Sequence, residues 1–273
     1  MKAARARWLL AASGALILVL SGCASGDAGG AGEAGDATSG ASPEPTLSGD
    51  LSVFAGASLT DVFTELGEQF EAENPDVEVT DFFNFGPSSG LATQINEGAP
   101  ADVFASANTS QMDVVTEAGN AEGEPTVFVE NVLQIAVPAG NPAGITGIAD
   151  FANPDLTLAI CAPEVPCGAA AETVFAAAGI TPSVDSLEED VRAALTKVEL
   201  GEVDAALVYV TDVISAGEAV EGIDFPESEE AVNSYPVVAL AAAPNPDAAQ
   251  AWVEFILSDV AAGALEEAGF RSP

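Results

Sequence analysis

LSVFAGASLTD, at residues 51–61, joins a short apolar strand to a helix through small residues that permit a tight turn. Beyond the turn, apolar side chains recur at i, i+3, i+4, i+7 and i+11, and these positions form one face of a helix. They are Leu59, Val62, Phe63, Leu66 and Phe70. The stretch therefore predicts a strand that leads directly into an amphipathic helix.

The same alternation continues along the chain. We expect further strands at 77–83, 102–106, 132–138, 156–161, 203–209 and 235–242. We expect helices at 88–96, 110–117, 167–178, 188–200 and 248–265, with a helical turn at 148–151. Alternating strands and helices predict an α/β fold with parallel sheets, in which ligands bind beyond the carboxyl ends of the strands.

Hydrogen-bonding residues occupy the predicted strand-to-helix junctions. Ser58 opens the first helix, and Ser88 and Ser89 open the second after a Gly-Pro turn. Free N–H groups at a helix start attract anions, and serine hydroxyls add further donors. Ser58 followed by Asp61 also fits a capping box, which is the favoured interpretation of that junction taken alone.

Two later junctions have the same character. Pro166 precedes Cys167 at the start of one helix, and Asp190 precedes Val191 at the start of the next. Asp190 can cap its helix and leave the Val191 N–H pointing outward, although carboxylates here can equally repel an anion. None of these junctions is specific by itself.

Composition excludes several classes of function. The chain has 43 acidic and 6 basic residues, and three of the basic residues lie within the first seven positions. Nucleic acid is excluded as a partner because phosphate neutralisation requires clustered Lys and Arg. The chain contains no histidine, so Ser-His-Asp triads and His-ligated metal sites are excluded. We expect no catalytic residues, no enzymatic activity and no cofactor.

The N-terminus has the layout of an export signal. Basic residues precede an apolar run that ends in LSGC, similar to a bacterial lipobox, so residues 1–22 are expected to be removed and Cys23 lipidated. The alternatives are an uncleaved anchor and an ordinary signal with a chance cysteine. Residues 23–48 are rich in Gly, Ala, Ser and acidic residues and are expected to form a flexible linker. The protein would then be tethered to the outer face of the cytoplasmic membrane.

Taken together, the junctions resemble the molybdate-binding proteins of bacterial ABC importers. The matching motifs occur in the same order from residue 51 to residue 270: AGASLTD at 55–61, SSGLATQINEGAPADVF at 88–104, VPCG at 165–168, EDVRAAL at 189–195, LVY at 207–209, YPV at 235–237 and AGF at 268–270. Cys167 departs from the family, in which a small residue such as alanine is common at this position.

This resemblance implies a periplasmic-binding-protein type II fold with the ligand in a cleft between two lobes. Lobe 1 would comprise residues 49–130 with 239–273, and lobe 2 residues 131–238. Hinges are expected near 130–132 and 237–239. The protein would be a monomer that passes its ligand to an ABC permease and ATPase.

The resemblance also implies the site. The hydroxyls of Ser58 and Ser88, the amides of Cys167 and Val191 and the phenol of Tyr209 would hold molybdate or tungstate, with Ser89 as an adjacent candidate. The metal would be bound only as the oxyanion, without direct protein ligands. Without the resemblance, Tyr209 would be interpreted as a core aromatic residue.

Several further expectations complete the analysis. In an exported protein, the six-residue separation of Cys161 and Cys167 favours a disulfide over two free thiols. Binding is expected to be nearly independent of pH between about 6 and 8 because no histidine titrates there. A receptor for sulfate or thiosulfate is the alternative function, and a surface serine hydrolase is another, although the sequence offers no base for it.

Overall fold

The computed structural model describes residues 47–273, which fall within the compact unit Pro43–Pro273. The expected signal peptide, the lipidation site Cys23 and nearly all of the expected linker lie outside the described residues. Within the described part, no helix combines the length and the apolar character that crossing a membrane requires.

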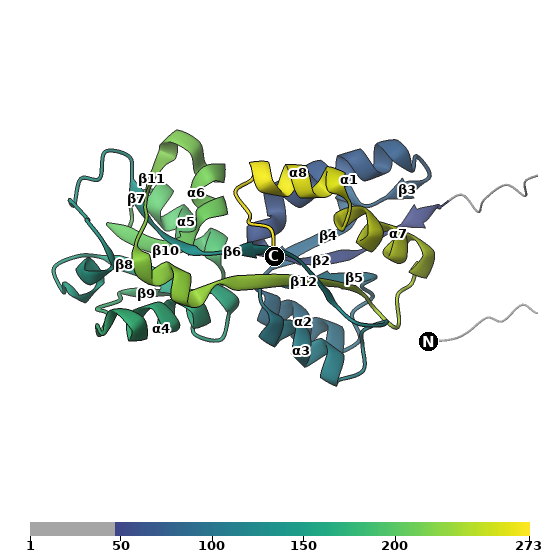
Figure 1. The fold of residues 1–273 in the computed structure, drawn as a ribbon, viewed down its shortest axis with the longest axis horizontal. Coiled ribbons are helices and arrows are strands. Elements are labelled where there is room, and N and C mark those ends of the chain that lie inside the picture. The colour runs from purple at the N-terminus through teal and green to yellow at the C-terminus, as the bar shows by residue number, and fades with distance from the viewer. Residues whose placement is uncertain (1–46) are drawn as a thin grey trace, which may run out of the picture. The chain divides into compact units, whose positions relative to one another are not determined.

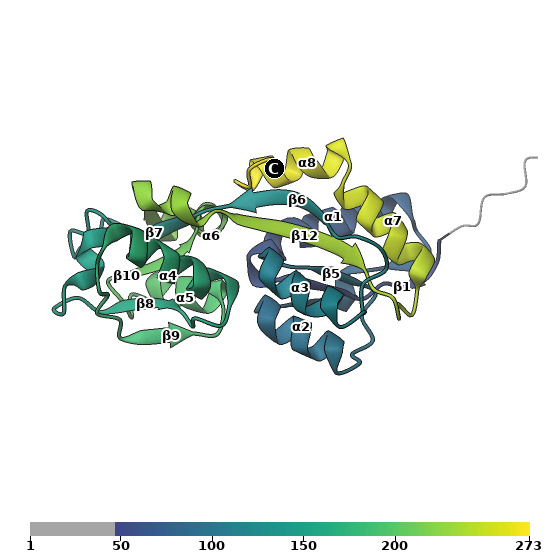
Figure 2. The same ribbon diagram turned by 60° about the horizontal axis from the view of Figure 1, so that its bottom comes forward.

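Lobe 1, as we define it here, is built on a five-stranded sheet in the order β4-β2-β5-β12-β6 (Figure 1). Helices α1, α7 and α8 cover one face of this sheet, and α2 and α3 cover the other (Figure 2). Its elements are β1 (Gly49–Asp50), β2 (Val53–Gly56), η1 (Ala57–Leu59), α1 (Thr60–Glu73), β3 (Val77–Glu78), η2 (Thr80–Phe82), β4 (Phe83–Gly86), α2 (Ser88–Asn96), β5 (Val103–Ala105), α3 (Thr109–Glu117), β6 (Thr126–Asn131), β12 (Asn233–Ala239), α7 (Pro246–Ile256) and α8 (Asp259–Glu267).

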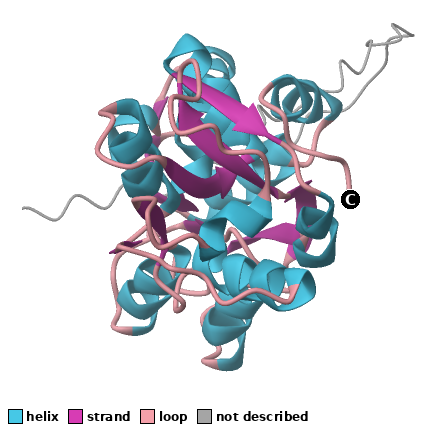
Figure 3. Ribbon diagram, turned by 90° about the vertical axis from the view of Figure 1, so that its left-hand side faces the viewer, coloured by secondary structure: helices cyan, strands magenta, loops and turns pink. Residues whose placement is uncertain are grey.

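Lobe 2 is built on a second five-stranded sheet in the order β11-β7-β10-β8-β9, against which α4, α5 and α6 pack. Figure 3 views the molecule from the end of this lobe, with helices around the strands. Its elements are β7 (Leu133–Pro138), η3 (Ile148–Ala152), β8 (Leu158–Cys161), α4 (Pro166–Ala178), β9 (Ser186–Glu188), α5 (Val191–Glu199), β10 (Ala205–Tyr209), α6 (Val210–Ala216), η4 (Gly217–Ala219), β11 (Val220–Ile223) and η5 (Pro226–Ala231).

The chain crosses between the lobes twice. The first crossing lies at Val132, between β6 and β7, where the sequence predicted it. The second lies at Val232, before β12, and not at 237–239. The expected boundary at residue 238 is therefore too late, because Val237 pairs with Ala105 of β5 and all of β12 belongs to the sheet of lobe 1.

Both sheets are mixed, whereas the alternation of elements predicted parallel sheets. Strands β4, β2 and β5 are parallel, but β12 runs antiparallel to β5 and β6. In lobe 2, β7 runs antiparallel to both β10 and β11. The crossing connections explain the difference, since a strand that returns from the other lobe enters its sheet in the opposite direction.

The core of lobe 1 forms around the helix face predicted from the spacing of apolar residues. Phe63 and Phe70 of α1 contact the ring of Trp252 edge to face, with centroids 5.7 and 5.2 Å away. Trp252 and Ile256 of α7 are buried, and Phe255 is partly buried beside them. Such aromatic contacts add to the stabilisation from burial alone.

Backbone contacts fix the loop between β8 and α4. Cys161 and Cys167 form a disulfide with Cα atoms 5.7 Å apart, which is the pairing that the sequence favoured. Gly168 lies directly behind this loop, where an added Cβ atom would collide with the carbonyl oxygen of Ala162. Glycine is therefore required here by close backbone approach, and not by a left-handed conformation.

We predict that Gly168→Ala lowers the free energy of unfolding by about 1–3 kcal/mol or more, because the backbone of the disulfide loop has to move. Gly263→Ala is the matched control, since Gly263 lies in α8 with open space around its missing Cβ. That change should raise stability by about 0.5–1 kcal/mol. Equal effects of both changes in urea unfolding would contradict the close approach at Gly168.

Candidate functional site

A small cavity lies where the strand-to-helix junctions of the two lobes face each other. Its volume is about 10 Å³, which is roughly the room needed for one water molecule. The lining residues are Ala57, Ser58, Gly86, Pro87, Ser88, Ala107, Val165, Pro166, Cys167, Asp190, Val191 and Tyr209.

This lining contains five of the residues predicted from the sequence: Ser58, Ser88, Cys167, Val191 and Tyr209. Ser89, the adjacent candidate, is not among the lining residues. The reason is helical geometry, because Ser88 is the first residue of α2 and Ser89 is turned about a quarter of a turn around the helix axis.

Ser58 lies in η1, at the end of β2, and does not cap α1. The N-cap position of α1 is Leu59, without a side-chain hydrogen bond. The Ser58 hydroxyl is instead 2.9 Å from the phenol oxygen of Tyr235, which is buried on β12. The capping-box interpretation of Ser58 and Asp61 is therefore wrong, since both side chains have other partners.

Ser88 is 1% exposed, and its Oγ accepts a hydrogen bond from the Ala107 N–H at 3.0 Å. Because this hydroxyl already accepts a backbone donor, its own hydrogen is available to a ligand in the cavity. Gly56 lies beneath it, where a Cβ atom would approach the Ser88 oxygen to 3.2 Å. The small residues of the 51–61 stretch thus leave room for this serine.

Two helix N-termini of lobe 2 also reach the cavity. Cys167 follows Pro166 in the first turn of α4, and Val191 is the first residue of α5. The first N–H groups of a helix have no intrahelical acceptor and carry the positive end of the helix dipole. Asp190 caps α5 by accepting from the Ala193 N–H at 2.9 Å, as the sequence suggested.

Tyr209 lies at the end of β10, just before α6, and is 1% exposed. Its phenol oxygen is buried and has no partner in residues 47–273 that meets hydrogen-bond geometry, although the side chains of Tyr235 and Asn233 lie near enough to affect its pKa. Burial raises the pKa of Tyr209 well above its usual value, so the phenol keeps its proton and remains a donor at neutral pH. An unsatisfied buried donor is costly, which points to a ligand that accepts from it.

The cavity is rich in donors, and its lining contains no cationic side chain. The basic residues at 192, 197 and 271 each form an ion pair with a carboxylate elsewhere. Asp190 contributes the carboxylate in the lining, and one of its oxygens is used by the helix cap. This arrangement suits an anion that accepts hydrogen bonds and carries no proton of its own.

Asp212 lies immediately behind the site and could not be identified from the sequence. It is 1% exposed, and its Oδ2 accepts from the Tyr209 N–H at 2.9 Å, while its Oδ1 has no partner. Burial raises the pKa of Asp212 to about 7, against the opposing effect of the Arg192 charge. A carboxyl group therefore titrates near neutral pH, which removes the basis for the expected pH independence.

Tyr235 is the other residue that reasoning from the sequence missed as part of the site. It carries the partner of the Ser58 hydroxyl, and its ring contacts that of Tyr209 edge to face at 6.1 Å. Its position in the YPV motif was the available signal, but the motif gives no indication of what the hydroxyl contacts.

Comparison with known proteins places the chain in a family. The family of bacterial extracellular solute-binding proteins matches residues 51–271. The chain belongs to this family. Among curated solute-binding proteins, the molybdate-binding protein ModA of Mycobacterium tuberculosis is 43% identical over 221 residues, which cover 81% of this chain and 84% of that protein.

Solved structures of solute-binding proteins share the fold. The substrate-binding domain of a molybdenum ABC transporter from Clostridium difficile is 26% identical, with a TM-score of 0.61, and the match covers 82% of this chain and 99% of that one. The sulfate-binding protein SubI of Mycobacterium tuberculosis has a TM-score of 0.73 at 18% identity, covering 82% and 86% of the two chains. The second likeness shows the fold alone.

We predict that Asp212 makes stability depend on pH. Its pKa in the folded state is raised above the unfolded value near 3.8, so the folded state binds the proton more tightly and stability falls as pH rises from about 4 to 7. The slope from this group is at most about 1.4 kcal/mol per pH unit. The melting temperature of Asp212→Asn minus that of the wild type should therefore increase between pH 5 and pH 8.

The comparison between variant and wild type isolates this group, because the other carboxylates titrate in both proteins. The Asn side chain retains an oxygen for the Tyr209 N–H. A difference in melting temperature that stays constant from pH 5 to pH 8 would show that Asp212 is ionised throughout.

Proposed function

We propose that this protein is an extracytoplasmic receptor that captures molybdate in the cavity between its lobes and delivers it to an ABC permease. The observation that carries the proposal is the unpartnered phenol of Tyr209, buried in the same cavity as Ser58 and Ser88. The similarity to molybdate-binding relatives supports the choice of ligand. Tungstate has the same charge and tetrahedral shape and should also bind.

The chemistry of the lining favours such a dianion. Hydroxyls of Ser58, Ser88 and Tyr209 can donate, as can the free N–H groups at the starts of α4 and α5. A fully deprotonated oxyanion needs only donors, whereas an anion that keeps a proton also needs an acceptor. Helix N-termini supply the positive potential that the lining side chains lack.

The role as a receptor, without catalysis, agrees with the partners of the two serines. The Ser58 hydroxyl contacts the phenol of Tyr235, and the Ser88 hydroxyl accepts from a backbone N–H. Neither partner is a general base, so neither serine is activated as a nucleophile. Sulfate remains the competing ligand, because SubI has the same fold.

The delivery step rests on the N-terminal segment. We propose that residues 1–22 direct export, that Cys23 carries the lipid, and that residues 23–48 link the lipid to the folded part. The receptor would act as a monomer at the outer face of the cytoplasmic membrane and would hand its anion to permease and ATPase subunits.

Titration calorimetry with molybdate, tungstate, sulfate, thiosulfate and phosphate tests the ligand. We expect molybdate and tungstate to bind far more tightly than the other three anions. Native mass spectrometry should show one bound anion per chain. Tighter binding of sulfate would reassign the receptor, and labelling by a serine-reactive phosphonate would favour a hydrolase instead.

Ser88→Ala should weaken molybdate binding by about 1.5–3 kcal/mol, the value of a hydrogen bond to a charged group. This corresponds to a rise in Kd of roughly 10- to 150-fold. Ser89→Ala is the matched control, because it removes the same atom from the next residue of α2, outside the cavity lining. Equal Kd values for the two variants would contradict the assignment of Ser88.

Molybdate affinity should fall as pH rises from 6 to 8. Asp212, with a pKa of about 7, gains a negative charge behind Tyr209 over this range, and the charges of Arg192, Asp61 and Asp190 act on it. Asp212→Asn should give a nearly flat profile. If the wild type and the variant show the same profile in calorimetry, Asp212 does not act on the ligand.

A further inference from the structure

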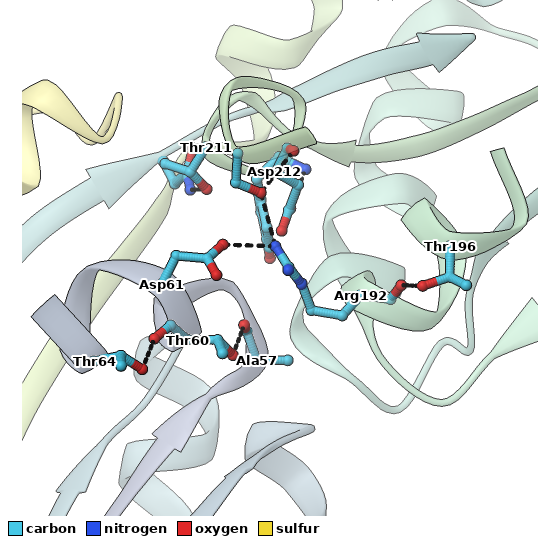
Figure 4. A network of polar contacts seen from close by, with 11 residues as sticks. Ala57, Thr60, Asp61, Thr64, Arg192, Thr196, Thr211 and Asp212 are labelled. Atoms are coloured by element: carbon cyan, nitrogen blue, oxygen red, sulfur yellow. Dashed lines mark hydrogen bonds and ion pairs between the residues drawn. The ribbon is translucent and has the colours of Figure 1, made fainter. Parts of the chain in front are cut away.

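Two ion pairs join the lobes within residues 47–273, and one of them lies beside the cavity. Arg192 Nη1 of α5 donates to Asp61 Oδ2 of α1 at 2.9 Å, and Figure 4 shows the two side chains directed toward each other. Of the other ion pairs in residues 47–273, Lys197–Glu188 lies within lobe 2. Arg271–Glu229 is the other pair between the lobes, because Glu229 lies in η5 of lobe 2 and Arg271 bridges to Glu130 of β6 in lobe 1.

The pair is attached to the same elements that form the cavity. Arg192 follows Val191, whose amide is at the start of α5. Asp61 comes three residues after Ser58, in the first turn of α1. A large enough movement of Ser58 away from Val191 would therefore also pull Asp61 away from Arg192.

Arg192 is oriented from within lobe 2. Its Nη1 also donates to Ser215 Oγ at 2.7 Å, and the Ser215 hydroxyl donates to the carbonyl of Asp212 at 3.0 Å. Both of these partners belong to α6, the helix that begins directly after Tyr209. The guanidinium is thus held in place by its own lobe, and Asp61 is the partner contributed by the other lobe.

We propose that Arg192 is a positioning residue for anion capture, which pairs with Asp61 when the lobes close and keeps the oxyanion cavity shut. This inference rests on the proposed function. The ion pair makes no contact with the ligand and acts through the relative position of the lobes. Its role is to slow the release of a bound anion, since closure brings the two charges together after the anion has entered.

The side chains are 36% and 57% exposed, so the effect should be modest. Exposed ion pairs of this kind contribute little, and the expected change in dissociation rate is about two- to fivefold. High salt should reduce it further, because exposed charges are screened.

Two substitutions with opposite charge changes provide the test. Arg192→Gln makes the protein more negative, and Asp61→Asn makes it less negative. A general electrostatic effect on an anionic ligand predicts weaker binding for the first and tighter binding for the second. Loss of the ion pair predicts faster dissociation of molybdate in both, measured by stopped-flow, and the double variant should be no worse than either single one.

Lys197→Gln is the matched control for charge. It removes one positive charge from α5 and breaks the Lys197–Glu188 pair, which lies inside lobe 2 at 3.3 Å. The dissociation rate should stay at the wild-type value in this variant. Melting temperatures without ligand should be similar for all the single variants, because the proposal concerns closure and not folding.

The outcomes separate this inference from the proposed function. If the wild type binds molybdate and Asp61→Asn binds it more tightly or releases it no faster, the role of Arg192 in closure is refuted. If the wild type binds sulfate and not molybdate, the proposed function fails, and the release rates of sulfate from the same variants test the closure role. Equal sulfate release from the wild type and Arg192→Gln would then refute the closure role as well.

Discussion

The attraction of an anion to the partial positive charge of helix N-termini is the interaction on which the candidate site depends. The starts of α4 and α5 reach the cavity from lobe 2, while η1 and α2 bring Ser58 and Ser88 from lobe 1. These groups act over hydrogen-bond distances, whereas the repulsion from a chain with 43 acidic residues is screened over roughly 8 Å at physiological ionic strength. A donor-lined cavity can therefore coexist with an anionic scaffold.

The buried polar groups around the cavity form a second level of organisation. Tyr235 supports the Ser58 hydroxyl, the Ala107 amide supports Ser88, and Asp212 accepts from the Tyr209 amide. Tyr235 and Ala107 are distant in sequence from the serines that they contact, and Asp212 lies in the helix that begins directly after Tyr209. The contact of Asp212 with Tyr209 depends on the protonation of Asp212, because burial raises its pKa to about 7 and its Oδ1 has no hydrogen-bond partner in the described residues.

The spacing of neighbouring residues predicted those helices and strands whose formation depends on neighbouring residues alone. The apolar spacing along α1 was sufficient to predict that helix, whereas the serines at the helix starts became candidates for the site only through resemblance to a family. The expected strand at 77–83 is broken because the Glu71 carboxylate accepts from the amides of Val79 and Thr80. Residues 188–190 were assigned to a helix, but Glu188 belongs to strand β9 and pairs with Cys161 of β8. Contacts between distant residues decided both cases.

The same limit applies to the site. Tyr209 was identified through resemblance to a family, because a tyrosine at a strand end is usually a core residue. Asp212, Tyr235 and the pairing of Arg192 with Asp61 gave no local signal, since each depends on elements that are brought together by the crossing strands. The second crossing was expected at 237–239, inside the predicted strand 235–242, whereas the chain enters lobe 1 before β12 begins at Asn233.

The basic residues of the folded part are all paired with carboxylates, and this affects how a ligand arrives. At long range, the electrostatic potential around the folded part repels any anion, so molybdate has to diffuse against this repulsion before short-range hydrogen bonds attract it. Dissolved salt weakens the long-range repulsion and leaves the short-range attraction nearly unchanged. A saltier medium would thus quicken the encounter, which is the reverse of the behaviour of receptors that attract their ligands with opposite charge.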